Sequence, residues 1–504
     1  SLLPFQFKPA WSCEAAHITA NLMAALLAAS DLEAREVIPS SAPADASDRC
    51  MKVERWYVLT VLSVGSCAQC LNWFIHSSVQ DRKFYDYYHG AAFQCLSARQ
   101  LEFQIRLLLN WGPIFGVLGF PLSTVLLSRP WGLRVVVRLG LTFVAFGAVV
   151  RWLPSSPDPF GPKATALAGS PFLSLCLLHL GQIFNAFAGP FVMGCVSRLA
   201  VVWFPEQQRP IATAMASTAN GLGVTVGFLL GPWLVPTSSR YGTLLGVSVI
   251  ASIIPWMFAM LYYPAAPVRP PSAAAAVWFD GSTGVGGFLQ GLRLAVSNLG
   301  YGQLVLAAGI LAGSSNAWQG VLQDTLKPIG YTDTFVGYLG FANCVGGTLG
   351  ALCSGSVAGS TMRRRFKKLI VFGLILIIAP GLVWSLICGK AGVHILLIVL
   401  IATMGLGSGI ASPMFYELGA ELTYPAPEGT SAGLLVFIIN VTSLSMIFIP
   451  TSSGLIMNSV YLILVLLCAL LVALVRERYL RPVDKGAVVQ QGGSDPIHSI
   501  SVRQ

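Results

Sequence analysis

Apolar blocks of about 20 residues recur along the chain, and a helix of that length crosses the ~30 Å hydrocarbon core of a bilayer. There are twelve such blocks. They cover residues 56–76, 105–128, 133–153, 171–193, 210–235, 241–263, 298–322, 334–358, 367–388, 393–416, 430–451 and 455–475. Backbone polar groups in hydrocarbon must be hydrogen-bonded within the protein, and barrel strands would be about half as long and would alternate polar and apolar residues. The sequence therefore predicts an all-α, polytopic membrane protein with twelve transmembrane helices.

Composition excludes several other classes of protein. The 504 residues are 55% hydrophobic and 10% charged, whereas a soluble protein carries about 25% charged residues. The net charge of +10 comes largely from basic residues in loops and tails, where membrane topology explains them, so nucleic acid is not an expected partner. The eleven Cys residues include a single CxxC, Cys67–Cys70 inside span 1, with no second pair to complete a four-ligand site, and the sequence has no GxxxxGKS/T loop. We therefore expect no metal site, no cofactor and no direct coupling to ATP.

The distribution of charge and of Pro and Gly divides the chain into parts. Most Lys and Arg residues lie in the tails and in alternate loops, which places both termini in the cytosol. An aromatic–Pro turn follows the fourth and the tenth span, as two parallel repeats would give. The predicted parts are a disordered cytosolic N-terminal tail (1–55), an N-terminal six-helix bundle (56–263), a cytosolic linker rich in Pro, Ala and Gly (264–297), a C-terminal six-helix bundle (298–475) and a cytosolic C-terminal tail (476–504).

Polar and aromatic residues within the spans are candidates for a solute-binding site, because polar groups in lipid are costly unless they face protein or a cavity. Those that we assign to substrate binding are Gln69, Asn72 and Trp73 in span 1, Gln182 and Asn185 in span 4, Asn316, Trp318 and Gln323 in span 7, and Asn440 in span 11. Such a cavity suits a small amphiphilic or cationic solute through stacking, cation–π contact and amide hydrogen bonds. For Trp73 and Trp318, a place in the interfacial aromatic belt is an equal alternative.

Few ionisable groups within the spans bear on ion coupling. His179 in span 4 is a candidate proton carrier, but a core histidine bonded to a neighbour is the simpler interpretation. Asp324 precedes Lys327 by three residues near the end of span 7, which predicts a solvated ion pair at a helix end. The absence of paired carboxylates within the spans argues against sodium and leaves protons as the candidate coupling ion.

Charged residues near the cytosolic ends of the spans form a second candidate site. We assign gating roles to Arg198, Arg209, Glu417, Glu421 and Glu428. Glu417 and Glu421 lie one helical turn apart in span 10, and the corresponding region of the other half carries Arg198 and Arg209. These opposite charges predict an ion-pair latch that closes the cytosolic gate when the binding site faces outward.

Glycines four residues apart occur in three spans. The motifs are Gly223-xxx-Gly227-xxx-Gly231, Gly346-xxx-Gly350 and Gly405-xxx-Gly409. Small residues at this spacing let helix backbones approach closely, so they predict either tight packing or a moving interface between helices. The sequence leaves both interpretations open.

Several motifs resemble a known family. The loop Ser128-Arg129-Pro130-Trp131-Gly132-Leu133-Arg134 after span 2, with the six-and-six split, resembles the major facilitator superfamily, although Ser128 stands where that family has Asp. The segments Trp203-Phe204-Pro205 with Arg209, and Phe415-Tyr416-Glu417-Leu418 with Glu421 and Glu428-Gly429, are similar to the feline leukaemia virus subgroup C receptor-related family. The resemblance covers residues 56–475 and implies the major facilitator fold and solute transport.

Within that family the resemblance bears on the substrate. Trp73 matches a Trp in span 1 of the choline- and haem-associated members. Two positions that carry amide residues in those members are changed here. The position in span 5 is Gly221, which follows Asn220, and the position in span 11 is Asn440. The resemblance adds Asn220 to the substrate site. Asn440 and the run Trp318-Gln319-Gly320-Val321-Leu322 look more like the "disrupted in renal carcinoma 2" branch, a lysosomal, proton-dependent pyridoxine transporter.

The sequence thus predicts a secondary-active or facilitative transporter that moves a small organic solute by rocker-switch alternating access. Pyridoxine is the favoured solute, with choline, ethanolamine and haem as alternatives. A membrane receptor that does not transport is the alternative from another class. An enzyme is not expected, because no nucleophile–base or metal-ligand cluster occurs at usable spacing in the spans. The expected setting is a multi-pass monomer in the bilayer of the lysosomal or plasma membrane.

Overall fold

The structure is a computed structural model of the chain. It describes residues 44–76, 79, 87, 98–127, 129, 131–155, 171–271, 285–320, 322, 326, 329–359, 364–390, 392–426, 428–447 and 454–480. The chain forms two units, Ser1–Val53 and Glu54–Gln504, and the fold described below is that of the second unit. Residues 1–43 of the tail predicted to be disordered, and residues 481–504 of the predicted C-terminal tail, fall outside the described residues.

Every element in the described part of the chain is a helix, which confirms the all-α prediction. The N-terminal half contains α2 (Ala44–Phe74), α4 (Ala98–Leu127), α5 (Gly132–Trp152), α6 (Pro171–Gly194), α7 (Val196–Trp203), α8 (Arg209–Leu234) and α9 (Tyr241–Leu261), with the short 3-10 turns η1 (Leu153–Ser155), η2 (Glu206–Gln208) and η3 (Ser238–Arg240). The C-terminal half contains α11 (Val285–Ser297), α12 (Leu299–Gly320), α14 (Asp333–Gly359), α15 (Phe366–Ile387), α16 (His394–Thr423), α17 (Glu428–Ile447) and α18 (Gly454–Leu474).

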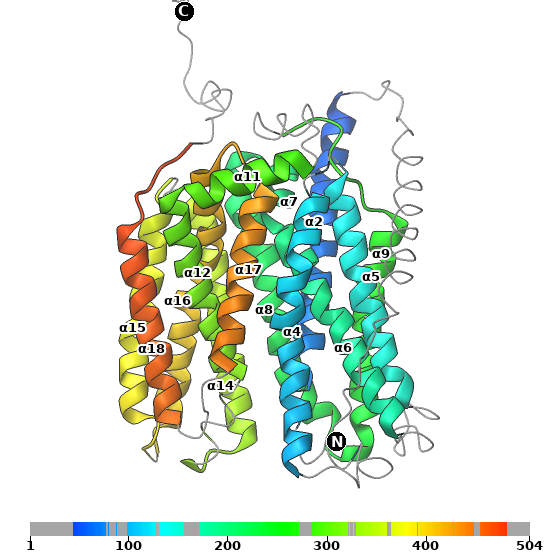
Figure 1. Ribbon diagram of the computed structural model, residues 1–504, viewed down its shortest axis with the longest axis vertical. Helices are drawn as coiled ribbons and strands as arrows, with labels where there is room; N and C mark the ends of the chain where they lie inside the picture. The colour runs from blue at the N-terminus through cyan, green and yellow to red at the C-terminus, as the bar shows by residue number, and fades with distance from the viewer. Residues whose placement is uncertain are drawn as a thin grey trace, which may run out of the picture. The chain divides into compact units, whose positions relative to one another are not determined.

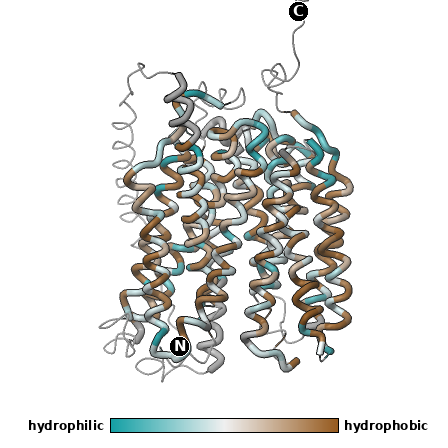
Figure 2. Tube along the Cα trace, turned by 180° about the vertical axis from the view of Figure 1, so that it is seen from behind, coloured by the Kyte–Doolittle hydropathy of each residue, from teal (hydrophilic) through white to brown (hydrophobic). Residues whose placement is uncertain are grey.

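The helices of the described chain account for the predicted spans. Ten are long and apolar enough to cross a bilayer, and the bent pair α11–α12 makes eleven. The apolar part of α17, Thr430–Ser445, is a shorter helix that falls on the predicted span 430–451. Each predicted span therefore coincides with a helix. Figure 2 shows why, because hydrophobic residues run along the helices and hydrophilic residues gather mainly at their ends.

Two helices differ from the predicted boundaries. α2 begins at Ala44, inside the segment predicted to be a tail. α11 forms inside the predicted linker and turns by 88° into α12, and Figure 1 shows it lying across one end of the C-terminal half. Ala295 of α11 is fully buried in the core of that half, so the helix packs on the end of the bundle. Its 13 residues are too short to cross a bilayer, which is why the hydropathy pattern did not reveal it.

The helices form two groups that meet mainly along two pairs of helices. In the N-terminal half, α5 packs against α6 and α9, and α4 packs against α6. In the C-terminal half, α14 and α15 pack against α16, and α12 packs against α17 and α18. The halves meet where α4 contacts α17 and where α8 contacts α14, and Figure 1 shows α4 beside α17 between the two groups. This is the two-half arrangement that the sequence predicts.

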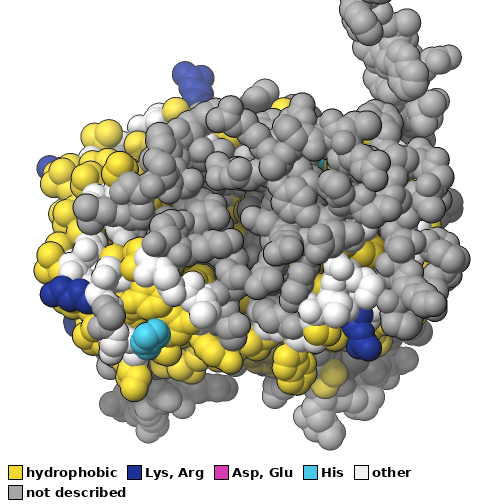
Figure 3. Space-filling model, turned by 90° about the horizontal axis from the view of Figure 1, so that it is seen from below, with side chains coloured by type: hydrophobic (Ala, Val, Ile, Leu, Met, Phe, Trp, Pro, Cys, Tyr) yellow, Lys and Arg dark blue, Asp and Glu magenta, His cyan; other side chains and the backbone are white. Residues whose placement is uncertain are grey.

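The two ends of the helical bundle differ in charge. We call the end with the α4–α5 and α14–α15 turns the basic end, because it holds Arg129, Arg209 and the segment 364–368. Figure 3 shows the opposite end. Its described side chains in that view are hydrophobic or uncharged, with scattered basic groups and a histidine, and none of them is acidic.

The glycine motifs of α14 and α16 pack these two helices against each other. A Cβ atom at Gly350 would collide with the carbonyl oxygen of Leu406, and one at Gly409 with that of Gly347. Both helices belong to the C-terminal half. The motifs therefore serve close packing within one half, and in these two helices the packing interpretation holds over that of a moving interface.

Candidate functional site

A cavity of about 240 Å³ lies between the two halves. Its walls come from α2, α4, α6 and α8 on one side and from α12, α14, α16 and α17 on the other. None of the described residues that line it is charged. The lining consists of carboxamides, hydroxyls, sulfur atoms and aromatic rings, so the cavity offers hydrogen bonds and ring stacking without a fixed charge.

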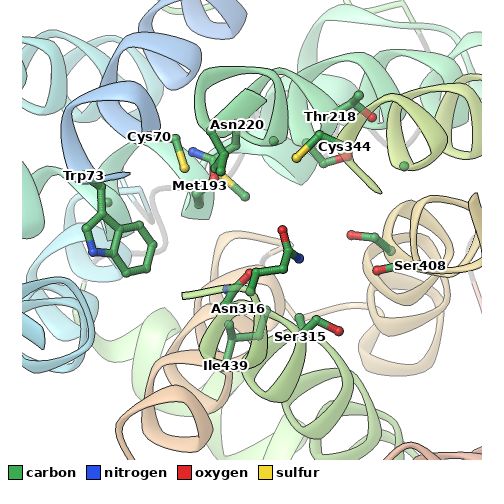
Figure 4. Close-up of a pocket in the computed structure, with 18 of the residues that line it drawn as sticks. Cys70, Trp73, Met193, Thr218, Asn220, Ser315, Asn316, Cys344, Ser408 and Ile439 are labelled. Carbon is green, nitrogen blue, oxygen red and sulfur yellow. The ribbon is translucent and has the colours of Figure 1, made fainter. Parts of the chain in front are cut away.

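Five of the predicted substrate-binding residues line this cavity: Gln69, Trp73, Asn220, Asn316 and Asn440. Figure 4 shows the Trp73 ring entering the cavity from α2, and the Asn316 side chain entering from α12 of the other half. Gln319, one turn beyond Asn316, also lines it. A solute in the cavity would therefore contact both halves at once, as alternating access requires.

Hydrogen bonds fix the wall formed by α2, α6 and α8. Gln69 Nε2 donates to the Asn185 carbonyl over 3.3 Å, and Asn185 Nδ2 donates to the Gln69 carbonyl over 3.1 Å. Asn220 Nδ2 lies 3.2 Å from both Gln69 Oε1 and Ser66 Oγ. Asn185 is thus a support behind the wall and does not line the cavity. The carboxamides of Gln69 and Asn220 are oriented before a solute arrives, which lowers the entropic cost of binding.

Two glycines of α4 make room for cavity side chains, and the sequence analysis missed both. A Cβ atom at Gly112 would come within 2.5 Å of Trp73 Cζ2. One at Gly116 would lie 2.5 Å from Asn440 Oδ1. Gly112 and Gly116 are four residues apart, so the spacing that singled out other spans was a usable signal in this one as well.

A buried cationic network lies behind Trp73. Arg151 in the last turn of α5 is fully buried, and its guanidinium donates to the carbonyl and Oδ1 of Asn72 and, over 2.6 Å, to Gln182 Oε1. Gln182 Nε2 donates to the Trp73 carbonyl over 3.3 Å, and Asn72 Nδ2 donates to Ser252 Oγ over 2.7 Å. Asn72 and Gln182, which we predicted to bind substrate, therefore support Trp73 from behind and do not line the cavity. The signal for Arg151 was an Arg within an apolar block, the last of three Arg residues in the predicted span 133–153.

Trp318 also lies away from the cavity. It is 1% exposed in the core of the C-terminal half, and its Nε1 donates to Asn458 Oδ1 over 2.9 Å. Its ring stacks on Tyr461 with the centroids 5.0 Å apart. A buried Trp with a satisfied N–H is a packing residue, so neither the cavity nor the aromatic belt is its place. Asn316 faces the cavity because two residues turn a helix by about 200°.

The histidines have partners within the N-terminal half. His179 Nδ1 accepts a hydrogen bond from Trp111 Nε1 over 2.9 Å, in agreement with the interpretation of a histidine bonded to a neighbour. His76 Nδ1 lies 2.5 Å from the Tyr241 hydroxyl. Neither histidine lines the cavity. Three predicted residues fall outside the described part of the chain: Gln323, Asp324 and Lys327.

Sulfur and hydroxyl groups line the cavity at positions that the sequence did not indicate. Cys70, Met193 and Cys344 contribute the sulfur atoms, and Figure 4 shows them around the same space as Asn220. The hydroxyl groups come from Ser217, Thr218, Ser315, Thr348, Ser408, Ser412 and Tyr416. Such residues are ordinary in transmembrane helices, so only the fold shows which of them face a solute.

Four of the predicted gating residues are buried at the basic end: Arg198, Arg209, Glu417 and Glu421. Arg198 donates to the carbonyls of Leu127 and Arg129 in the α4–α5 turn. Glu417 accepts a hydrogen bond of 2.7 Å from Thr213 Oγ1 of the other half. The fifth residue, Glu428, begins α17, and its side chain is outside the described set. The structure brings the Glu417 carboxylate to the interface between the halves, and the pairing of the carboxylates with the arginines stays a prediction.

Other contacts hold the halves together at the basic end. The rings of Phe120 and Phe437 lie 5.2 Å apart between α4 and α17. A Cβ atom at Gly355 of α14 would lie 2.7 Å from the Ala214 side chain of α8. The cavity is therefore separated from the basic end by packed side chains and by the Thr213–Glu417 hydrogen bond.

The chain matches a protein family and known relatives in sequence. The family model described as the Major Facilitator Superfamily matches residues 62–444. The solute carrier family 49 member 4 homolog of Xenopus laevis is 30% identical over 413 residues, which cover 77% of this chain and 82% of that protein. The human protein named choline/ethanolamine transporter FLVCR2 is 26% identical over 407 residues, which cover 79% of this chain and 71% of that protein.

Solved structures share the fold at low sequence identity. The proton:xylose symporter XylE bound to 6-bromo-6-deoxy-D-glucose has a TM-score of 0.64 at 12% identity, over 85% of this chain and 98% of that chain. FucP, a transporter solved in the outward conformation, has a TM-score of 0.58 at 15% identity, over 83% of this chain and 98% of that chain. At such identities the likeness concerns the fold alone.

Proposed function

Because this chain belongs to the Major Facilitator Superfamily and, within it, to solute carrier family 49, we propose that it carries a small organic solute, uncharged or with a single positive charge, through the cavity between its halves. The family resemblance and the major facilitator fold predicted from the motifs are confirmed. The chain is a multi-pass membrane protein of a family of transporters and not of enzymes.

The proposed cycle rests on contacts at the basic end. There the Thr213–Glu417 hydrogen bond and the Phe120–Phe437 ring contact join the halves. To release a solute at that end, the halves must separate along α4–α17 and α8–α14. As the halves separate, the solute would change its contacts with each half while it stays between Trp73 and Asn316. This is rocker-switch alternating access around a fixed central site.

The uncharged lining carries the proposal about the solute. Without an Arg or Lys among the described lining residues, an anionic solute would lose its hydration with no opposite charge in return. Trp73 offers a ring for stacking, and Gln69, Asn220 and Asn316 offer amide donors and acceptors. A neutral aromatic ring with several hydroxyl groups matches both features, so a pyridoxine-like solute is the first candidate. Haem carries two carboxylates and fits this lining less well.

Choline or ethanolamine is the second candidate. The face of Trp73 can stabilise an ammonium group by cation–π attraction, worth about 0.5–2 kcal/mol. A relative that is 26% identical to this chain is named a choline/ethanolamine transporter. The amide groups of the cavity would then hold the hydroxyl group of the solute.

Transport by purified protein tests both candidates. The protein is placed in phosphatidylcholine vesicles, and uptake of labelled pyridoxine and labelled choline is measured for the wild type and for Trp73→Ala, Asn316→Ala and Trp233→Ala. Trp233 is 86% exposed on the surface of α8 and is the matched control. We expect the first two variants to raise KM about tenfold and the control to behave like the wild type. Cavity variants with unchanged KM would reject the site, and a wild type that moves neither compound would reject both solutes.

We also propose the orientation, the membrane and the coupling ion of the transporter. The positive-inside rule supports a cytosolic basic end. We propose a monomer in the lysosomal or plasma membrane, with protons as the candidate coupling ion. Because no described lining residue is ionisable near neutral pH, a coupled proton would be carried by a group outside the lining, such as His179 or Glu417.

A further inference from the structure

Two basic segments more than 100 residues apart in the sequence meet at the basic end of the C-terminal half. One is the segment 364–368 at the start of α15, and the other is the segment 476–480 that follows α18. The Phe366 N–H donates to the Tyr479 hydroxyl and the Lys367 N–H to Glu477 Oε1, each over 3.1 Å. Lys367 Nζ donates to the carbonyl of Val475 at the end of α18 over 2.7 Å. The chain after α18 is therefore fastened onto the start of α15.

The joined segments form a basic surface. Arg364 lies over the Tyr479 ring at 5.6 Å, and its left-handed backbone turns the chain into α15. The exposed basic side chains beside it are Arg365, Lys368, Arg476 and Arg478. The acidic side chain described between them is Glu477, which already accepts hydrogen bonds from the Lys367 N–H and the Tyr479 hydroxyl. Burial, and then the bond to Glu477, raises the pKa of Tyr479, so its hydroxyl stays protonated and keeps this connection.

Apolar side chains continue this surface along the outside of the same two helices. Phe372 and Ile375 of α15 are 52% and 56% exposed, and Leu470 and Leu474 of α18 are 58% and 56% exposed. α15 and α18 pack against each other. A basic surface at the level of the headgroups thus stands directly over two neighbouring helices that face the acyl chains.

We propose that this junction is a binding site for an anionic phospholipid, whose phosphate-bearing headgroup lies among Arg365, Lys368, Arg476 and Arg478 and whose acyl chains lie along α15 and α18. A lipid matches the surface better than a free phosphate ion, because the basic and apolar parts adjoin. Clusters of Lys and Arg just outside a transmembrane helix are typical of such recognition. What distinguishes this site is that the segment 364–368 is joined to the segment 476–480. A polybasic loop that acted through its charge alone would not need this junction.

Lipid titration with the full-length protein tests the site. Purified protein is titrated with dioleoyl-phosphatidylserine and, separately, with dioleoyl-phosphatidylcholine, and bound lipid is counted by native mass spectrometry. Each basic side chain contributes roughly fivefold to binding an anionic surface, so Arg365→Gln/Lys368→Gln should weaken phosphatidylserine binding about 30-fold. The matched control is Arg240→Gln/Lys390→Gln, which removes two exposed charges from the opposite end. Equal binding of both lipids, or equal losses in both double variants, would overturn the proposal.

Two further arms separate this site from simpler explanations. Arg476→Gln/Arg478→Gln removes the two exposed charges that the C-terminal segment supplies and leaves the loop unchanged, and we expect it to weaken phosphatidylserine binding about 30-fold. Unchanged binding would show that the C-terminal segment takes no part, and the joint site would be rejected.

Excess inorganic phosphate should displace the lipid only weakly. Complete displacement would identify a site for free anions instead. Variants are compared only when they elute as the wild type does on size exclusion.

Discussion

Replacement of Arg151 by Met should destabilise the N-terminal half. The side chain is fully buried and donates to three acceptors, which are the carbonyl and Oδ1 of Asn72 and Oε1 of Gln182. Met has a similar length but no donor, so all three acceptors lose this partner. Polar contacts between membrane helices are worth about 0.6–1.7 kcal/mol each, which gives a loss of about 2–5 kcal/mol. Arg151→Lys keeps the charge and should fall between Met and the wild type.

Thermal unfolding in detergent, followed by a thiol-reactive dye, measures this effect. We expect the midpoint to fall in the order wild type, Lys variant, Met variant, and the order matters more than the values because such unfolding is often irreversible. Transport should fall as well, since Gln182 also holds the Trp73 carbonyl. A control is Arg240→Met, an exposed arginine at the start of α9. An Arg151→Met protein as stable as this control would refute the reasoning.

Three other changes test separate parts of the structure. Gly112→Ala should push the Trp73 ring into the cavity and raise KM in the uptake assay, with little change in the unfolding midpoint. Thr213→Val leaves the Glu417 carboxylate without this donor, so spin-label distances across the basic end should lengthen, whereas unchanged distances would argue against a gate there. Gly409→Val places side-chain atoms against the backbone of α14 and should cost about 3 kcal/mol or more. Gly302→Ala, where a Cβ atom meets nothing within 4 Å, is its control in the unfolding assay.

Hydropathy was enough to predict the fold, because the bilayer imposes a length on every span. The run of apolar residues that marks α15, for example, has no polar residue from Leu369 to Val383. The bent helix α11 escaped because its signal is amphipathic and its length is 13 residues. A helix that lies on the end of a bundle needs only one apolar face, and a window that averages all faces does not detect it.

The cavity was predicted in part, because polarity marks a residue as buried in protein without saying which neighbour it faces. Gln69 and Asn72 are both polar and both in α2, yet only Gln69 lines the cavity. A three-residue step keeps two side chains on about the same face of a helix. What separates these two is the Arg151 guanidinium, which takes Asn72 away from the cavity. Arg151 comes from another helix, and one sequence does not reveal such a partner.

The two halves use corresponding helices in different ways. Asn72 joins α2 to α9 through Ser252, and Trp318 joins α12 to α18 through Asn458, so polar bonds tie the corresponding pair of helices in each half. Only the N-terminal half turns the neighbouring tryptophan, Trp73, toward the cavity. The tryptophan ring that lines the cavity thus belongs to one half, and the Asn316 amide belongs to the other. When the halves rock, these two groups move relative to each other. A solute that needs both can bind tightly in only part of the cycle, and this difference in affinity is what lets it be released.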